Sequence, residues 1–257
     1  MKNMFSLEGR TALVTGGSRG IGKMIAAGFV AHGARVYISS RKAAACEATA
    51  KELSAHGTCM PLPVDVSTVD GAKALAAAYG KHEKKLDILV NNAGAAWLEK
   101  FDVFPEKGWD KVMDLNLKAP FFLTQALHGM LREAARADRP AKVINIASID
   151  GIAVNPQETY SYAASKAGLI HLTKRMSLKL IEDNIVVSAI APGAFVSDMN
   201  IDARDNAEAV AKRIPSKRIG TDEDMAGAAI YLASRAGDYV VGATVVVDGG
   251  VSLSRVQ

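Results

Sequence analysis

Seven short apolar runs alternate with longer helical patterns, and this alternation constrains the fold more than any other feature of the chain. The runs cover residues 11–15, 36–39, 60–64, 88–90, 142–146, 185–190 and 244–247. Such a rhythm is typical of successive strand–helix–strand units. Because most runs are apolar at consecutive positions, as in Ala12, Leu13 and Val14, both faces of the strands should be covered. The pattern predicts a doubly wound, Rossmann-like α/β fold, with a parallel seven-stranded sheet and helices on both faces.

The chain is long enough for one sizeable core and shows no sign of a boundary within it. It has 257 residues, and α/β folds of this length are often single domains. No internal repeat, low-complexity tract or Pro/Gly-rich linker interrupts the pattern. The sequence therefore predicts a single domain over residues 1–257.

Composition points to a soluble, cytoplasmic protein. No run approaches the roughly 20 apolar residues of a membrane span, and residues 1–10 lack a basic region followed by an apolar stretch. Cys46 and Cys59 are isolated thiols without Cys-x-x-Cys spacing, which suits a reducing compartment. We expect no membrane partner.

The charge pattern favours small anionic ligands over nucleic acid. The formal net charge is +4, but lysines and arginines are scattered among aspartates and glutamates. A nucleic-acid interface would instead cluster its cations on one face. The five histidines show no metal-ligand spacing, so we predict no metal site.

A glycine-rich turn directly follows the first predicted strand. It reads Thr-Gly-Gly-Ser-Arg-Gly-Ile-Gly over residues 15–22, and a helical pattern begins at its end. In this context glycines let the backbone approach a pyrophosphate, and the helix N-terminus attracts negative charge. The candidate cofactor-binding residues here are Gly16, Ser18, Arg19, Gly20, Ile21 and Gly22.

The end of the second predicted strand indicates which dinucleotide binds. NAD sites usually place a carboxylate there for the ribose hydroxyl, whereas NADP sites replace it and add a cation. The residues here are Ser40 and Arg41, and an arginine can bind a phosphate through two parallel hydrogen bonds. We therefore predict NADP(H), with Arg19 as a second cation; a solvated helix start at residues 41–42 is the alternative.

Two further polar positions lie where a cofactor would pass. Residues 91–94 read Asn-Asn-Ala-Gly after the fourth strand, and Asn92, Ala93 and Gly94 are candidate cofactor-binding residues. The small residues leave room for a flat ring, and the asparagines can hold turns by side-chain hydrogen bonds. Asn116 lies inside a helical pattern, but its neighbours Leu115 and Leu117 are apolar. A buried polar role is therefore expected for Asn116.

A tyrosine and a lysine separated by one helical turn supply candidate acid–base chemistry. Tyr162 and Lys166 are four residues apart, so both side chains can point into one cleft. A nearby cation should lower the pKa of the phenol from about 10 towards neutrality. Ser148, fourteen residues upstream, offers a hydroxyl to polarise a carbonyl oxygen. Tyr160 is the rival tyrosine, but six residues from the lysine put it on another face.

Taken together, these motifs resemble the short-chain dehydrogenase/reductase family in order and spacing over almost the whole chain. The resemblance implies a catalytic set of Asn116, Ser148, Tyr162 and Lys166, with Asn116 supporting a water relay to the lysine. It also implies cofactor contacts from Asp65 and Val66 at the adenine, and from Pro192, Gly193 and Ser197 at the carboxamide. Similar proteins are homo-oligomers, so a homotetramer is expected.

The resemblance extends to bacterial NADPH-dependent 3-oxoacyl reductases, and three hypotheses on function stay open. The first is an NADPH-dependent carbonyl reductase acting on a 3-oxoacyl thioester or similar β-keto compound, giving a secondary alcohol. The second is a dehydrogenase or reductase of a free ketone, sugar or secondary alcohol. The third is a non-catalytic cofactor-binding regulatory protein, against which the complete Ser148, Tyr162 and Lys166 set counts.

An acyl carrier protein is a further partner to consider. Reductases that use one tend to place arginines on two long helices, whereas Gly129 and Leu178 occupy the approximate positions here, with Arg132 and Arg175 nearby. This departure counts against carrier docking.

Residues 194–216 form a polar, weakly patterned stretch between a strand and a later helix. Long connections of this kind are often lids or binding loops. We predict a substrate lid at about 194–216 that is mobile without ligand, the alternative being a well-packed helical excursion. The substrate pocket should form between this lid, Trp97 and residues 150–158.

Overall fold

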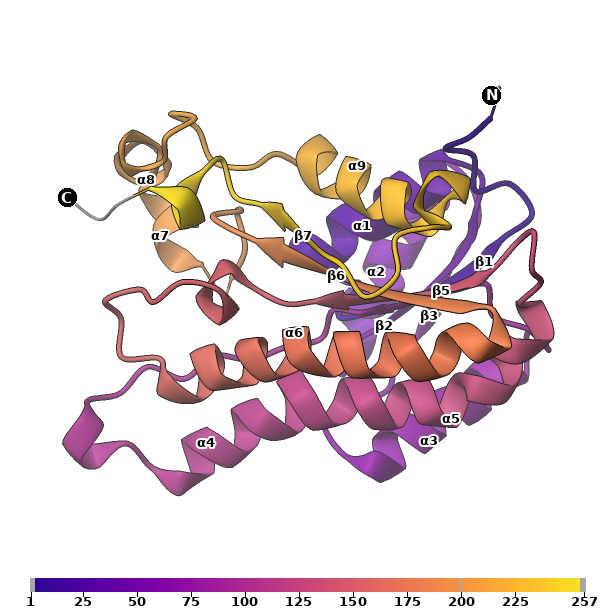
Figure 1. The fold of residues 1–257 in the computed structure, drawn as a ribbon, viewed down its shortest axis with the longest axis horizontal. Helices are drawn as coiled ribbons and strands as arrows, with labels where there is room; N and C mark the ends of the chain where they lie inside the picture. Colours follow the sequence, from indigo (N-terminus) through magenta and orange to yellow (C-terminus); the bar gives the residue numbers. More distant parts are fainter. Residues whose placement is uncertain (1–2, 199, 255–257) are drawn as a thin grey trace.

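The computed structural model describes residues 3–198 and 200–254, and its centre is one parallel sheet of seven strands (Figure 1). The strands are β1 (Thr11–Thr15), β2 (Arg35–Ser39), β3 (Cys59–Leu62), β4 (Ile88–Asn91), β5 (Ala141–Ile146), β6 (Ile185–Pro192) and β7 (Thr244–Val247). Their order across the sheet is β3-β2-β1-β4-β5-β6-β7, and every neighbouring pair is parallel. The predicted doubly wound fold is confirmed, and each predicted strand is found within two residues of its expected ends.

Helices cover both faces of this sheet (Figure 1). One face carries α1 (Gly20–Ala31), α2 (Ala43–Leu53) and α9 (Asp222–Ala233). The other carries α3 (Val69–Gly80), α5 (Ala119–Ala134) and α6 (Tyr160–Leu180), with α4 (Glu106–Met113) against α6. None of the helices in the described part of the chain is long and apolar enough to cross a membrane.

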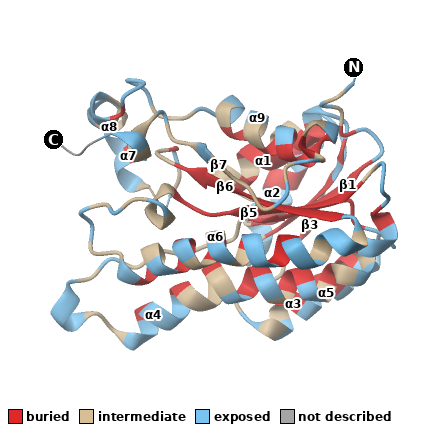
Figure 2. Cartoon of the chain, in the orientation of Figure 1, coloured by how far each residue is buried: buried red, intermediate tan, exposed pale blue. Residues whose placement is uncertain are grey.

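The core is divided by the sheet because neighbouring strand residues point to opposite faces. In β1, Ala12 and Val14 pack with α1 and α9, whereas Leu13 packs with α3 and α5. All three are fully buried, and the central strands are buried along their whole length (Figure 2). Burial on both faces explains why these strands read as continuous apolar runs rather than as alternating ones.

The chain reverses its winding direction between β1 and β4, which are neighbours in the sheet although β2 and β3 lie between them in sequence. In such sheets, ligands bind in the crevice outside the carboxyl ends of the strands at this switch point. The glycine-rich turn after β1, residues 92–94 after β4, and Ser148 after β5 all lie at this edge. The topology therefore brings the candidate residues to one end of the molecule.

Residues 194–216 contain two short helices, α7 (Ile201–Asp205) and α8 (Ala207–Arg213), at the same end of the molecule (Figure 1). Phe195, Ala203 and Ile214 are buried, so the segment has more apolar anchoring than its polar sequence indicates. Residue 199 of the predicted lid lies outside the described residues. Whether the segment moves stays a prediction.

Candidate active site

The backbone of the glycine-rich turn packs tightly against the first residues after β4. Gly16 has φ +64°, a conformation that favours glycine, and a Cβ there would lie 2.8 Å from Asn92 Nδ2. A Cβ on Gly22 would lie 2.3 Å from the Gly16 carbonyl oxygen. The α1 helix begins at Gly20, and no acidic residue lies in its first turn. The bare backbone and the helix N-terminus fit the pyrophosphate of a dinucleotide.

Ser18 and Ile21, which also belong to this turn, make contacts within the protein. The Ser18 carbonyl oxygen accepts a hydrogen bond from Thr49 Oγ1 at 2.9 Å. Ile21 packs against the core beneath α1. Both residues therefore hold the turn against α2 and the sheet, and the sequence pattern did not separate this role from direct cofactor contact.

Thr15 and Asn92 join the ends of β1 and β4 into one crevice floor. The backbone N–H groups of Asn92 and Ala93 both donate to Thr15 Oγ1 at 3.0 Å. The Asn92 amide also donates to the Thr15 and Gly16 carbonyl oxygens at 2.9 and 3.2 Å. The Asn92 side chain thus fixes the glycine-rich turn, which is a positioning role.

The residues expected at the adenosine end lie together beyond the carboxyl ends of β2 and β3. Arg41 is exposed and Ser40 is partly buried, its hydroxyl donating to the Lys42 carbonyl oxygen at 3.2 Å. Asp65 is exposed and accepts a hydrogen bond from the Ser67 N–H at 3.0 Å, while Val66 is buried. An exposed guanidinium without an adjacent carboxylate on β2 suits a phosphate ligand.

Arg19, the second predicted cation, has a protein partner. Its guanidinium forms an ion pair with the Asp198 carboxylate, which also pairs with Arg204 of α7 at 3.5 Å. Asp198 lies within the predicted lid. The glycine-rich turn and the lid are therefore linked by charge, a contact that sequence reasoning did not anticipate.

The residues expected at the carboxamide end stand opposite the glycine-rich turn. Pro192 ends β6, and the Gly193 N–H donates to the Val247 carbonyl oxygen at 2.9 Å. A Cβ built on Gly20 would lie 3.1 Å from the Ser197 Cβ, so Ser197 borders that turn. The structure thus brings the first and last parts of the predicted cofactor site into contact.

Asn116 is buried, as expected, but it lies in a π-helical turn (Asp114–Lys118) between α4 and α5. Its Oδ1 accepts from the Ala95 N–H at 2.8 Å, and its Nδ2 donates to the Ala95 carbonyl oxygen at 2.9 Å and to Ser165 Oγ at 3.0 Å. A Cβ on Gly94 would lie 3.2 Å from Asn116 Oδ1 and 3.9 Å from Lys166 Nζ. Asn116 therefore ties the loop after β4 to α6, near Lys166.

Ser148, Tyr162 and Lys166 meet at the carboxyl end of β5. Ser148 is buried, and its Oγ accepts a hydrogen bond from the Asp150 N–H at 3.1 Å. Lys166 is 5% exposed, with its Nζ donating to the Ile146 carbonyl oxygen at 2.7 Å and lying 5.6 Å from the centre of the Tyr162 ring. One turn of α6 thus places the phenol and the ammonium together, as their spacing predicts.

The electrostatics of this group differ from the sequence-based expectation. Burial lowers the pKa of Lys166 to about 8, and the Asp150 charge acts in the opposite direction. Burial raises the pKa of Tyr162 to about 12, which Asp150 also favours and a hydrogen bond with Ser148 opposes. The expected lowering of the phenol pKa is therefore wrong for this structure, because desolvation outweighs the hydrogen bond with Ser148. The phenol is protonated at neutral pH and can donate a proton.

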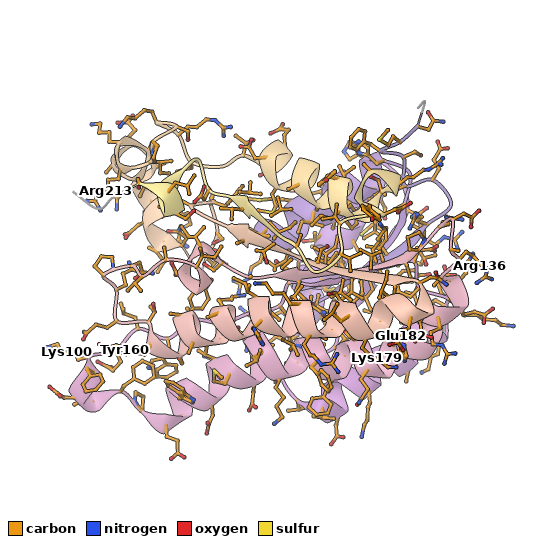
Figure 3. The ribbon with its side chains drawn as sticks, in the orientation of Figure 1. Lys100, Arg136, Tyr160, Lys179, Glu182 and Arg213 are labelled. Carbon is orange, nitrogen blue, oxygen red and sulfur yellow. The ribbon has the colours of Figure 1, made fainter. Side chains whose placement is uncertain are left out.

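Tyr160 faces away from this group, which agrees with its exclusion as the acid. Its hydroxyl donates to Glu158 at 2.9 Å, and its ring makes edge contacts with Phe101 and Phe104 at centroid distances of 5.6 and 5.7 Å. Phe104 in turn contacts Trp109 at 6.4 Å. Figure 3 labels Tyr160 at the end of the molecule where α6 begins.

We call these four side chains, Phe101, Phe104, Trp109 and Tyr160, the aromatic wall. Backbone hydrogen bonding strengthens it, since the Glu99 N–H donates to the Glu158 carbonyl oxygen at 3.3 Å. Sequence reasoning identified only Trp97 in this region. The concentration of aromatic residues between positions 97 and 109 was the available signal.

Apolar side chains are exposed around the same end of the molecule. They are Leu98, Phe101, Val103, Ile152 and Val154, the last being 94% exposed. The Nζ of Lys111 lies over the Trp97 ring, 5.3 Å from its centre. Among residues 3–198 and 200–254, no group of three or more His, Cys, Asp or Glu side chains could hold a metal ion.

Comparison with known proteins agrees with the fold. Residues 16–252 match the family model described as enoyl-(acyl carrier protein) reductase. A Pseudomonas aeruginosa protein described as a rhamnolipids biosynthesis 3-oxoacyl-(acyl-carrier-protein) reductase is 46% identical, over 98% of this chain and 100% of its own. A 2-dehydro-3-deoxy-D-gluconate 5-dehydrogenase from Dickeya dadantii is 36% identical, over 96% of this chain and 97% of its own.

A solved structure shares the architecture described above. The Pseudomonas aeruginosa RhlG/NADP active-site complex aligns with a TM-score of 0.94 at 46% identity, covering 98% of this chain and 100% of that one. The match spans the sheet, both helical layers and the catalytic end. The chain therefore belongs to the short-chain dehydrogenase/reductase family and is an oxidoreductase of that family.

Proposed function

We propose that the protein is an NADPH-dependent carbonyl reductase that converts a 3-oxoacyl thioester, or a similar β-keto compound, into the secondary alcohol. The observation that carries this proposal is the meeting of Ser148, Tyr162 and Lys166 beside a glycine-rich nucleotide crevice. A protonated phenol and a serine hydroxyl at one point suit a carbonyl oxygen that gains negative charge.

Each residue has a distinct part in the proposed reaction. NADPH held in the crevice would supply the hydride that the carbonyl carbon accepts. Ser148 donates a hydrogen bond to the carbonyl oxygen, and Tyr162 transfers its proton to that oxygen, so the product is a neutral alcohol. Lys166 binds ribose hydroxyls and stabilises the charge that the phenol acquires. Asn116 holds the loop after β4 close to Lys166 through Ala95 and Ser165.

The preference for NADPH rests on the end of β2. Arg41 is exposed there beside Ser40, and neither residue is acidic. The related Pseudomonas structure is described as an NADP complex, which supports the same cofactor. Asp65, Val66, Pro192, Gly193 and Ser197 complete the proposed contacts along the crevice, and residues 194–216 are proposed as the lid.

The apolar surroundings of the site favour an acyl substrate. The aromatic wall and the exposed side chain of Val154 offer apolar surface to an aliphatic chain, which gains free energy on leaving water. The Pseudomonas relative is described as a 3-oxoacyl-(acyl-carrier-protein) reductase, which supports an acyl substrate. A sugar acid would gain little from such a surface.

A free hydroxylated ketone is the second candidate substrate. The Dickeya relative is described as a dehydrogenase of a deoxygluconate, at 36% identity over nearly the same length. This candidate predicts that polar groups at the entrance matter more than the aromatic wall.

The two positions at which an acyl carrier protein would meet arginines are uncharged in this chain. A Cβ on Gly129 of α5 would meet nothing within 4 Å, and Leu178 of α6 is exposed, so neither position offers a cation. Arg132 is nearby, but its Nε pairs with Asp183 at 3.2 Å. A smaller thioester carrier is therefore the better first substrate to test.

We further propose a cytoplasmic homotetramer. Cys46 and Cys59 are both free and buried, which suits a reducing compartment. At the edge of the sheet, β7 leaves Val246 exposed, and Tyr239 before it is 99% exposed. An exposed apolar edge strand is typically covered in an assembly.

The proposal is tested by NADPH consumption across a substrate panel. The panel compares 3-oxoacyl thioesters of increasing chain length with 5-ketogluconate, a diketone and an aryl ketone. We expect the highest kcat/KM for a 3-oxoacyl thioester, rising with chain length. Preference for ketogluconate would select the second candidate, and no turnover with any carbonyl compound would contradict the reductase assignment.

A further inference from the structure

The backbone of the glycine-rich turn ties Arg19 to the end of β2, where the phosphate of NADP(H) is proposed to bind. The Gly17 N–H donates to the carbonyl oxygen of Ser39, the last residue of β2, at 3.2 Å. The Ser18 carbonyl oxygen accepts from Thr49 Oγ1 of α2 at 2.9 Å. Arg19 follows directly, and its side chain is 60% exposed. Because exposed side chains change rotamer rapidly, the guanidinium can turn about a fixed backbone.

On its other side, Arg19 is joined to the lid segment, residues 194–216. Gly20 has φ +50°, and a Cβ built on it would lie 3.1 Å from the Ser197 Cβ. The Arg19 guanidinium forms an ion pair with the carboxylate of Asp198, the next residue of the segment, whose side chain is half exposed. A backbone contact and an ion pair therefore hold the lid segment against the glycine-rich turn.

Asp198 belongs to a row of four alternating charges formed by Arg19, Asp198, Arg204 and Asp205. Arg204 Nη1 lies 3.5 Å from Asp198 Oδ1, and Arg204 Nε lies 2.7 Å from Asp205 Oδ1. Arg204 Nη2 also donates to Asp205 Oδ2 at 3.0 Å. If Arg19 turns away, Asp198 still has Arg204 as a cationic partner. The row therefore permits Arg19 to leave, and an exposed ion pair holds it with only a small free energy.

A 2′-phosphate offers Arg19 a more highly charged partner than Asp198 does. A phosphate monoester carries about −1.5 to −2 charges at neutral pH, whereas a carboxylate carries a single one. A guanidinium can bind either group through two parallel hydrogen bonds. Arg41, the other candidate cation for this phosphate, is exposed just beyond β2, at the end of the sheet on which the turn sits. Arg19 thus has two alternative anionic partners, one from the lid segment and one from the ligand.

We propose that Asp198 competes with the 2′-phosphate of the cofactor for Arg19 and is thereby a residue that sets cofactor preference. Binding of the phosphate then releases the lid carboxylate from the glycine-rich turn and leaves it paired with Arg204. Asp198 weakens the binding of NADPH in this way but has no such effect on NADH, which lacks the phosphate. This role rests on the proposed binding of NADP(H), and the experiment below separates the failure of the two proposals.

The competition is tested with two nucleotides that differ in the 2′-phosphate alone, adenosine 2′,5′-bisphosphate and adenosine 5′-monophosphate. Their dissociation constants are measured by isothermal titration calorimetry at constant ionic strength. Asp198→Asn should tighten binding of the bisphosphate about two-fold to five-fold, which corresponds to the small free energy of an exposed ion pair. Binding of the monophosphate should not change. Asp202→Asn is the matched control, since it removes an exposed carboxylate of α7 that lies outside the row of charges, and it should change neither constant.

Arg19→Gln provides the second arm, because it removes the group for which the two anions compete. In this background, Asp198→Asn should no longer tighten binding of the bisphosphate. An effect that persists without Arg19, equal tightening of both nucleotides, or no tightening at all would overturn the competition. If the unmodified protein binds both nucleotides equally, the proposed NADP(H) preference fails and the competition fails with it. If it prefers the bisphosphate and Asp198→Asn leaves that preference unchanged, the competition alone fails.

Discussion

The Nζ of Lys166 lies 5.6 Å from the centre of the Tyr162 ring, one turn further along α6. Both groups are held in a desolvated site at the carboxyl end of β5. Burial disfavours the charged form of both groups, so it lowers the pKa of Lys166 and raises the pKa of Tyr162. Tyr162 is thus a protonated acid at neutral pH. The protonation state of Lys166 then sets the pH range over which we expect activity.

The first prediction concerns this pH range. With the pKa of Lys166 at about 8 and that of Tyr162 at about 12, kcat/KM for NADPH should fall as pH rises through about 8, because Lys166 loses its proton first. The profile should be measured between about pH 6 and 10 at constant ionic strength. A flat profile across this range would contradict the assigned role of the Lys166 charge.

The second prediction concerns cofactor choice. Arg41→Ala should weaken NADPH binding about ten-fold to a hundred-fold and leave NADH binding nearly unchanged, because a charge-assisted hydrogen bond is typically worth about 1.5 to 3 kcal/mol. Lys51→Ala, an exposed cation at the other end of α2, is the charge-matched control. The dissociation constants of both cofactors can be measured by fluorescence titration. Equal affinities of the unmodified protein for NADPH and NADH would contradict the proposal that Ser40 and Arg41 select NADPH.

The third prediction concerns residues 194–216. Within this segment, the amide hydrogens of α7 and α8 should exchange rapidly in the free protein and become protected when NADPH and a substrate analogue bind, because the contact between Arg19 and Asp198 is an exposed ion pair that contributes little alone. Phe195 and Ile214 are buried and should be protected in both states. Equal protection of α7 and α8 with and without ligands would favour a static helical excursion.

The fourth prediction concerns assembly. Light scattering at micromolar concentration should report about four times the chain mass of 27.1 kDa. Val246→Lys should reduce this mass, because it places a charge on the exposed edge strand β7. If the unmodified protein has the mass of a single chain, the proposed homotetramer is contradicted.

The fold could be predicted from the sequence because its central strands are buried on both faces. The runs at 11–15 and 244–247 coincide with β1 and β7, and the others differ only at their ends, where strand pairing rather than residue type sets the limits. The positions of Ser148, Tyr162 and Lys166 were also predictable, since topology and helical spacing determine them.

Other features of the site depend on tertiary packing, which residue type alone does not reveal. The pKa of Tyr162 was predicted in the wrong direction because its burial is decided by neighbouring segments. The aromatic wall forms only when residues 97–104 fold against the start of α6.

The central claim is that Tyr162 is the proton donor of an NADPH-dependent carbonyl reductase. The most direct test compares Tyr162→Phe with the unmodified enzyme in 3-oxoacyl thioester reduction, with the NADPH dissociation constant measured for both. The account predicts a fall in kcat of about a hundred-fold to ten thousand-fold, the typical contribution of a general acid, with NADPH binding nearly unchanged. Retention of more than about a tenth of the original kcat, against that general-acid expectation, would contradict it.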